Sequence, residues 1–206
     1  MENGKIGIIN YGGGNIFSLT ATLDRLGLAY GMVNKPEDIS NYDRLIIPGV
    51  GHAGQAMQKL ENTGLVDAIL TTQLPVLGIC VGMQLLTRFS EEGNKDLLKI
   101  FPLDTLLFAK RINEKVPHMG WNTVAFVDHH PLFQGLKTNA YFYFVHSYYV
   151  PFEEAYTIGT TNYGLDYAAA IANKNFVGVQ FHPEKSGTAG EQVLVNFAKL
   201  NLKTLQ

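Results

Sequence analysis

Short apolar runs alternate with helical patterns over the first ninety residues, and this alternation constrains the fold more than any other feature of the sequence. The runs lie at residues 5–10, 29–33, 44–47 and 74–79. Residues 16–26 place their apolar side chains on one helical face, and Gly27 ends the pattern. Strands that are apolar throughout and alternate with helices predict an α/β fold with a mostly parallel central sheet flanked by helices.

The second half of the chain has a different pattern. Its strand-like runs are separated by short polar turns, which favours antiparallel or mixed pairing. We expect these strands to continue the sheet and to add a smaller second one, and we expect a closing helix at residues 189–202. No repeat, low-complexity tract or linker divides the sequence, so residues 1–206 are expected to form one domain. The strand-like runs lie at residues 105–111, 122–127, 141–150, 156–161, 168–172 and 176–181.

Composition excludes several classes of protein. The chain has 206 residues, of which 46% are hydrophobic and 17% charged, and its formal net charge of −2 gives no reason to expect nucleic acid or an anionic membrane as partner. No apolar run approaches the roughly 20 residues of a membrane span. The first apolar run is too short and too polar-flanked for a signal peptide. The single cysteine rules out an intrachain disulfide and suits a reducing compartment, so we expect a cytoplasmic protein.

That cysteine, Cys80, lies between an apolar run and a helical pattern. Gly78 and Gly82 stand two residues to either side, where larger side chains would crowd a tight turn. A lone cysteine beside an apolar strand is usually a buried structural residue. Here the N-terminus of the following helix would point backbone N–H groups at the thiol and favour the thiolate, so we interpret Cys80 as a nucleophile.

A second apolar run, about a hundred residues later, ends in His182, Pro183 and Glu184. The i, i+2 spacing lets the imidazole and the carboxylate project to the same side of an extended segment, and Pro183 restricts the backbone between them. Glu184 could then orient His182 towards Cys80, as in a catalytic triad. An exposed polar loop is the plain alternative. A metal site is a weaker one, because no third ligand accompanies the pair.

Two glycine turns follow predicted strands. The turn at residues 12–15 fails the dinucleotide-binding pattern because Phe17 occupies the place of the third glycine, and no phosphate-binding lysine follows. We therefore expect no nucleotide cofactor. The turn at residues 48–51 could present a backbone N–H to an oxyanion, although a plain strand-exit turn is about as consistent with the sequence. Most of the other histidines, among them His118 and His146, are expected to be solvated or structural.

Residues 78–84 together with residues 182–184 resemble the class I, triad-type glutamine amidotransferases. More narrowly, the chain resembles the glutaminase subunits of imidazole glycerol phosphate synthases. The resemblance implies a flavodoxin-like fold, no cofactor, and hydrolysis of glutamine to glutamate and ammonia in histidine biosynthesis, where the ammonia is used to make imidazole glycerol phosphate and AICAR. The stretches that carry the narrower resemblance lie at residues 11–15, 48–51, 116–122, 143–149 and 181–187.

The resemblance also implies roles for individual residues. Cys80 would attack the side-chain amide, His182 would transfer protons, and Glu184 would hold His182. Backbone N–H groups would form the oxyanion hole, and a further set of groups would bind the substrate glutamine. The implied oxyanion residues are Val81 with Val50 or Gly51, and the implied substrate-binding residues are Gly49, Gln84, Glu92, Ser147 and Tyr148.

Relatives of this kind form a heterodimer with a separate (β/α)8-barrel cyclase subunit. The resemblance therefore implies such a partner for this chain, with a docking face near Asn15, Met119, Trp121, Tyr143 and Lys185. Trp121 is the only tryptophan, and a large aromatic residue on a polar loop is a natural interface anchor, although it could also be a partly buried core residue.

Three other functions stay open. Asn10 stands where the family usually has aspartate, and Ile16-Phe17 replaces a more usual Leu-Arg, so the partner could be a related synthase that uses ammonia to amidinate surface-polysaccharide sugars. A non-catalytic binding subunit would keep the fold without turnover. A stand-alone thiol hydrolase is the third possibility, and Gln84, Glu92 and the loop around Trp121 favour the glutaminase over it.

Overall fold

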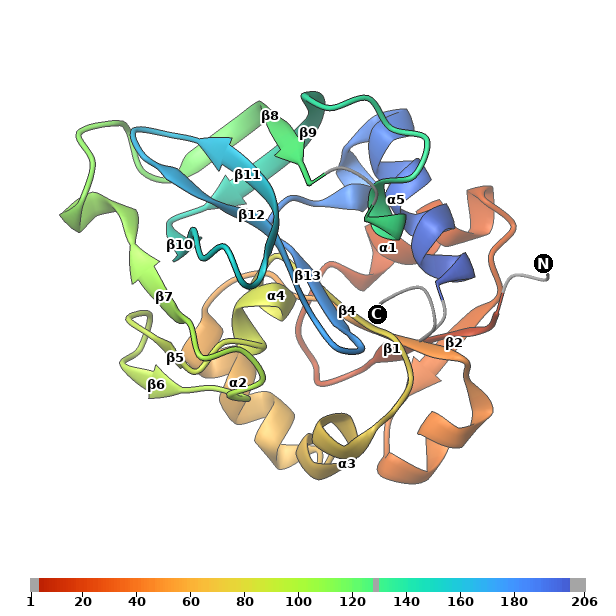
Figure 1. Ribbon diagram of the computed structural model, residues 1–206. Helices are drawn as coiled ribbons and strands as arrows, with labels where there is room; N and C mark the ends of the chain where they lie inside the picture. The colour runs from red at the N-terminus through yellow and green to blue at the C-terminus, as the bar shows by residue number, and fades with distance from the viewer. Residues whose placement is uncertain (1–3, 128–129, 201–206) are drawn as a thin grey trace.

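The computed structural model describes residues 4–127 and 130–200, and its central feature is the parallel sheet expected from the sequence (Figure 1). Five strands run parallel to one another, because each pairs in the same direction with its neighbour. They are short and almost entirely apolar. In spatial order they are β2 (Tyr30–Val33), β1 (Ile6–Ile9), β3 (Arg44–Ile47), β4 (Val76–Ile79) and β13 (Phe176–Val179).

Helices cover both faces of this sheet, as expected. In Figure 1, α1 and α5 lie together on one face, where an Arg25–Glu191 ion pair joins them, while α2 and α3 lie on the other. The buried Arg44 guanidinium donates to the carbonyls of Phe197 and Leu200, each at 2.8 Å, and so satisfies the C-terminal end of α5. The helices are α1 (Ile16–Arg25), α2 (Ala53–Asn62), α3 (Val66–Thr71), α4 (Val81–Leu85) and α5 (Gly187–Lys199).

Antiparallel strands extend the sheet beyond β13. One path continues through β12 (Asp166–Asn173), β10 (Tyr148–Pro151) and β7 (Asp104–Leu107) to β5 (Phe89–Ser90) and β6 (Lys95–Asp96). The other path leaves β12 through β11 (Thr157–Asn162) to β8 (His118–Phe126) and β9 (Ala140–His146). The strands of the second half are thus antiparallel to one another, except for the parallel β5–β7 pair, and they remain connected to the central sheet.

Several strands begin or end at other residues than the sequence predicts, and changes of pairing partner explain most of these differences. The run at residues 141–150 is two strands, since the chain leaves β8 at Ser147 and then pairs with β7 and β12. The strand expected to begin at Asn122 begins at His118, because its pairing with β9 starts with His118 opposite His146. The strand expected at residues 105–111 ends at Leu107, where Phe108 turns into the core.

Helix ends follow local chemistry. Asn15 caps α1 by accepting from the Ser18 N–H, and Gly27 supplies the left-handed conformation after the helix. The closing helix begins two residues before the expected Ala189 and ends at Lys199, and residues 201–202 lie outside the described part of the chain. Short 3-10 helices, three of which begin with proline, lie at Pro36–Asn41, Phe108–Lys110, Pro131–Phe133 and Pro183–Lys185.

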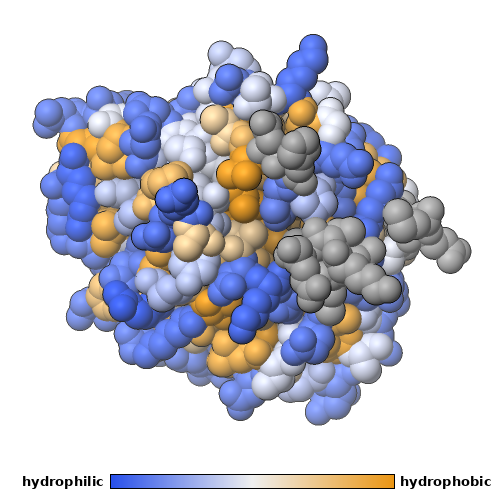
Figure 2. Space-filling view, viewed as in Figure 1, coloured by the Kyte–Doolittle hydropathy of each residue, from blue (hydrophilic) through white to orange (hydrophobic). Residues whose placement is uncertain are grey.

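The surface is mixed in character. On the face shown in Figure 2, hydrophobic side chains are interspersed among hydrophilic ones. The outer face of the β8–β9 hairpin exposes Met119, Trp121 and Tyr141, while alternate residues such as Phe142 and Phe144 point into the core. Among the described residues, no helix is long and apolar enough to cross a membrane.

Candidate active site

Cys80 forms the turn between β4 and α4, as the sequence predicts. It has φ 53° and ψ −110°, an unfavourable conformation for a residue with a side chain, and it is 3% exposed. Its backbone N–H donates to the Val179 carbonyl at 2.8 Å, and its carbonyl accepts from the Gln84 N–H at 3.1 Å. These bonds to β13 and α4 hold the thiol at the carboxyl end of the central strands.

Glycines make this turn sterically possible. A Cβ on Gly82 would collide with the carbonyl oxygen of Ile47, and one on Gly49 would collide with the backbone of Gly82 and with Val81. The loop after β3 therefore presses directly against the first turn of α4. This contact explains why Val50, Gly51 and Val81, the three predicted oxyanion residues, line the same cavity as Cys80.

His182 and Glu184 lie beside the thiol, with His182 at the end of the segment that follows β13. The His182 Nδ1 is 2.8 Å from the Glu184 Oε1, and the two side chains are 1% and 4% exposed. The His182 N–H donates to the Tyr143 carbonyl at 2.9 Å, and the Ser186 hydroxyl donates to the His182 carbonyl at 2.6 Å. The imidazole is therefore held through both its ring and its backbone.

The electrostatics of the pair favour the imidazolium form. Burial by itself lowers the pKa of His182, but its interactions with Cys80 and Glu184 outweigh burial and raise that pKa to about 10. The His182 Nε2 and the Glu184 Oε2 are buried and have no hydrogen-bond partner among residues 4–127 and 130–200. Buried polar atoms of this kind are uncommon outside functional sites.

These groups open into a cavity of about 400 Å³. Most of the residues predicted to bind glutamine line it, namely Gln84, Glu92, Ser147 and Tyr148. Gly49 does not; it lines a small adjoining cleft of about 10 Å³, on the side of His182 where Asn15 lies. Lys185 lines the cavity that contains Cys80 and so connects it with the predicted docking face.

Two of the predicted binding side chains are held by internal bonds. The Gln84 Nε2 donates to the Tyr148 carbonyl at 3.2 Å and to the Gln180 Oε1 at 3.1 Å, whereas the Gln84 Oε1 is buried and without a partner in the described part of the chain. The Glu92 Oε2 accepts from the Ala53 N–H at 2.6 Å, at the start of α2. An amide oxygen without a partner and an acidic group thus belong to residues that line the cavity, and N–H or ammonium groups are the partners that such oxygens bind.

The predicted docking residues lie next to this cavity. Met119 and Trp121 are 62% and 56% exposed on β8, so Trp121 is not a core residue. The Trp121 ring meets the edge of the Tyr143 ring with centroids 6.1 Å apart, and the Lys185 ammonium lies 6.0 Å from the Tyr143 centroid. Tyr143 bonds to the His182 segment through its carbonyl and, from its N–H, to the Ser186 hydroxyl at 2.9 Å.

Sequence reasoning assigned no role to two groups that border the thiol. The first is Gln180, which is fully buried and whose Nε2 lies 3.7 Å from the Cys80 sulfur. The second is a buried cluster in which the Tyr167 hydroxyl lies 2.9 Å from His118 Nδ1 and 3.0 Å from His146 Nε2. A polar residue inside the apolar run at 176–181 was the available signal for Gln180. The cluster joins strands far apart in the sequence and left no local pattern.

Burial makes the two clustered histidines neutral. It lowers the pKa of His118 to about 4 and that of His146 to about 3. The His146 Nδ1 lies 2.7 Å from the Tyr148 carbonyl and must carry a proton there, so its Nε2 is an acceptor, 3.0 Å from the Tyr167 hydroxyl and 3.3 Å from His118 Nδ1. The cluster thereby fixes the same carbonyl that holds Gln84. Within the described ranges, no group of three or more His, Cys, Asp or Glu side chains is arranged to hold a metal ion.

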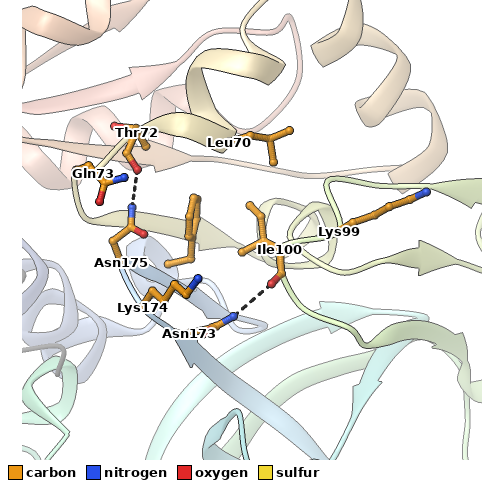
Figure 3. A pocket seen from close by; sticks show the side chains of 9 residues that line it. Leu70, Thr72, Gln73, Lys99, Ile100, Asn173, Lys174 and Asn175 are labelled. Carbon is orange, nitrogen blue, oxygen red and sulfur yellow. Dashed lines mark hydrogen bonds between the residues drawn. The ribbon is translucent and has the colours of Figure 1, made fainter.

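A larger cavity of about 550 Å³ lies at the amino ends of β4 and β13, opposite the thiol (Figure 3). Three of its polar side chains, those of Asn173, Asn175 and Lys99, are occupied by structural bonds. Asn175 donates to the Thr72 and Leu74 carbonyls, Asn173 donates to the Ile100 carbonyl, and Lys99 pairs with Asp96. This cavity contains none of the predicted site residues.

Comparison with known proteins gives consistent matches along the chain. The family model for glutamine amidotransferase class-I matches residues 7–200. The chain is 47% identical over 197 residues to the imidazole glycerol phosphate synthase subunit HisH of Bacteroides fragilis, covering 95% of this chain and all of that protein. It is 46% identical over 203 residues to the protein of the same name from Pasteurella multocida, covering 98% and 100%.

Solved structures agree at the level of the fold. A putative GMP synthase component from Thermoplasma acidophilum superimposes with a TM-score of 0.74 at 20% identity, covering 97% of this chain and 94% of that one. PurLQS from Thermotoga maritima gives a TM-score of 0.74 at 14% identity, covering 96% and 99%. At these identities the likeness concerns the α/β architecture.

Proposed function

We propose that this chain, which belongs to the glutamine amidotransferase class-I family, is the glutaminase subunit of an imidazole glycerol phosphate synthase and acts in histidine biosynthesis. One observation carries the proposal: the only thiol of the chain, a buried imidazole and a buried carboxylate converge on a single cavity. Similarity to the HisH subunits over nearly the whole chain supports the choice of glutamine as substrate.

The first step is attack by the Cys80 sulfur on the γ-carboxamide carbon of glutamine. The oxygen that becomes negatively charged would be bound by the N–H of Val81 and by that of Val50 or Gly51, which line the cavity together with the thiol. Because the pKa of His182 is raised, the imidazolium is present to protonate the departing ammonia. A γ-glutamyl thioester on Cys80 remains.

The second step reverses the role of His182. Now neutral, its imidazole removes a proton from water, which attacks the thioester carbon and releases glutamate and the Cys80 thiolate. Glu184 keeps the Nδ1 of His182 engaged throughout, so the other ring nitrogen serves both transfers. Glu92 and Gln84, which both line the cavity, would bind the amino end of the substrate through the Glu92 carboxylate and the unpartnered Gln84 oxygen.

The ammonia is delivered to a partner protein, for which we propose a (β/α)8-barrel cyclase that forms a heterodimer with this chain in the cytoplasm. The exposed outer face of the β8–β9 hairpin supports a docking role, because Met119 and Trp121 are large exposed apolar side chains and Met119 pairs across the hairpin with Val145, which lines the cavity. Tyr143 bonds directly to the His182 segment, so a partner that contacts Tyr143 would also act on the position of the imidazole.

The test is glutamate release from glutamine by the purified chain, first alone and then with the cyclase and its substrate or an analogue. Low activity alone and strong stimulation in the complex are expected. No release under either condition, with the Cys80 thiol confirmed as reduced, would contradict the proposal and favour a non-catalytic binding protein. Turnover only with the partner of a polysaccharide-amidinating synthase would assign the chain to that pathway.

The docking face has its own test. Trp121→Ala is expected to weaken binding of the cyclase at least tenfold, because buried aromatic anchors commonly contribute about 2 kcal/mol or more. Leu70→Ala is a matched control, since Leu70 is also an exposed apolar side chain but lies in α3 at the opposite end of the sheet. Equal affinities for the two variants, or unchanged Trp121 fluorescence on adding the cyclase, would remove Trp121 from the interface.

A further inference from the structure

Gln180 is placed beside the reactive thiol by the register of the central sheet. Strands β4 and β13 run parallel and end with Ile79 opposite Val179, so Cys80 and Gln180, the first residues after the two strands, lie close to each other. The Gln180 side chain is fully buried, and its Nε2 lies 3.7 Å from the Cys80 sulfur. His182, two residues further along, lines the same cavity as the thiol, whereas Phe181 between them stacks on Phe142.

The orientation of the Gln180 amide follows from its neighbours. The carbonyl of Tyr148 can only accept, so the Gln84 atom 3.2 Å from it must be the nitrogen. That same nitrogen lies 3.1 Å from Gln180, so the Gln180 atom it meets must be the oxygen. The nitrogen of Gln180 is then the end that faces the sulfur, and it carries hydrogens to donate.

A hydrogen-bond donor affects the two forms of the thiol differently. A neutral thiol can donate its own proton, and the Val145 carbonyl lies 4.0 Å from the sulfur to receive it. A thiolate can only accept, and the Gln180 N–H is directed at it. Donation to the charged form favours that form.

We propose that Gln180 is an additional catalytic residue, whose amide N–H donates to the Cys80 sulfur and stabilises the thiolate while Gln84 holds that amide in orientation. The inference rests on the proposed glutaminase function, because the thiolate is the species that attacks glutamine. Gln84 thereby has a second role besides substrate binding: it connects the Tyr148 carbonyl at the cavity wall to the environment of the nucleophile.

The experiment is a titration of the thiolate by its ultraviolet absorbance, with the Cys80→Ala protein as the blank. The chain has one cysteine, so the signal has a single source. In Gln180→Met, which keeps the size but lacks the donor, the midpoint is expected to rise by about one pH unit, so that the thiolate fraction at any pH well below the midpoint falls roughly tenfold. Glutaminase kcat, measured below that midpoint, should fall by a similar factor with KM nearly unchanged, because Gln180 contacts the sulfur.

Other titratable groups surround the thiol and also affect its midpoint, so the wild type and the Gln180 variants must keep all of them. They are Tyr11, Tyr167, His146, Glu92, Lys185 and the His182–Glu184 pair. Asn175→Leu is the matched control, because Asn175 is also a buried amide next to β13, but at the opposite end of that strand. It is expected to leave both the midpoint and kcat as in the wild type.

If Gln180→Met does not fold, Gln180→Asn keeps a polar amide but is one methylene too short to span from Gln84 to the sulfur, and the midpoint should rise in the same direction. An unchanged midpoint in a folded variant would overturn the proposed role of Gln180. If that variant still released glutamate from glutamine, the proposed glutaminase function would stand on its own. A raised midpoint supports the contact even if glutamine proves not to be the substrate, since the titration requires no glutamine.

Discussion

The two ends of strands β4 and β13 carry cavities of opposite character. At the amino end, the larger cavity of about 550 Å³ is bordered by Asn173, Asn175 and Lys99, whose polar groups all bond to backbone carbonyls or to Asp96. At the carboxyl end, the cavity of about 400 Å³ has Gln84 and His182 in its wall, each with a buried polar atom that finds no partner among the residues described.

The difference shows that cavity size does not locate the chemistry of this protein. Leaving a buried polar atom without a hydrogen bond costs roughly 1–3 kcal/mol. Of the five such side-chain atoms in the described residues, three belong to Gln84, His182 and Glu184 at the carboxyl end of the sheet, and the other two are Arg44 Nε and Thr161 Oγ1. At the amino end the amides close the sheet onto neighbouring loops. At the carboxyl end, Gln84 and His182 line the cavity and each keeps one polar atom without a protein partner in the described residues, so these atoms could bind a ligand.

The strongest test of this comparison is removal of the nucleophile. Cys80→Ala is expected to lower glutamate release by more than about 10³-fold, because no other group can form the thioester. The partner should still bind, since Cys80 is 3% exposed and so offers almost no surface to an interface. Glutamate release in the complex is the measurement, and retained turnover would contradict the mechanism.

Replacing the carboxylate tests the next largest effect. Glu184→Gln keeps the shape but removes the charge that supports the His182 imidazolium, and kcat is expected to fall roughly 10²-fold. The matched control is Glu153→Gln, a carboxylate in the turn after β10 with no part in the cavity. Equal kcat values for the two variants would show that Glu184 does not act on His182.

The same substitution should change how stability depends on pH. Because the folded-state pKa of His182 is raised to about 10, its contribution to stability is fully present below about pH 6.5 and is lost as the pH rises through about 10. Glu184→Gln removes part of that contribution. The difference in unfolding free energy between wild type and variant is therefore expected to shrink from pH 6 to pH 10, and a difference that grows with pH would contradict this assignment.

The smallest effect is expected at the amino-end cavity. Lys174→Glu reverses a charge in its lining at an exposed position, and we expect kcat and KM to stay within about twofold of the wild type, because long-range effects of exposed charges are screened. Steady-state kinetics of the complex will measure this. A change of tenfold or more would show that the two ends of the sheet are not functionally separate.

Sequence patterns predict the parts of this site that are formed by local chemistry. The turn at Cys80 requires Gly82 two residues later, and the short helix after His182 begins with Pro183. Both features can therefore be recognised within a few residues of sequence. The central strands are apolar because both faces are covered, which makes their type readable from composition alone.

The rest depends on contacts between distant segments. The role of Gln180 follows from the register of β13 against β4, and Glu92 reaches the Ala53 N–H across 39 positions of sequence. The break at Ser147 depends on which strands are available as partners. None of these is encoded in a short window, so periodicity places the residues on strands without showing what they touch.

The solitary thiol also determines how this protein can be damaged. If an oxidant converts Cys80 to a sulfenic acid, the chain offers no second cysteine with which to form a protective disulfide, so repair depends on a separate thiol such as glutathione. That molecule must enter by the cavity that admits the substrate, because the sulfur is otherwise enclosed. A glutamine bound in this cavity would shield the sulfur from peroxide, so irreversible oxidation is expected mainly in protein molecules without substrate.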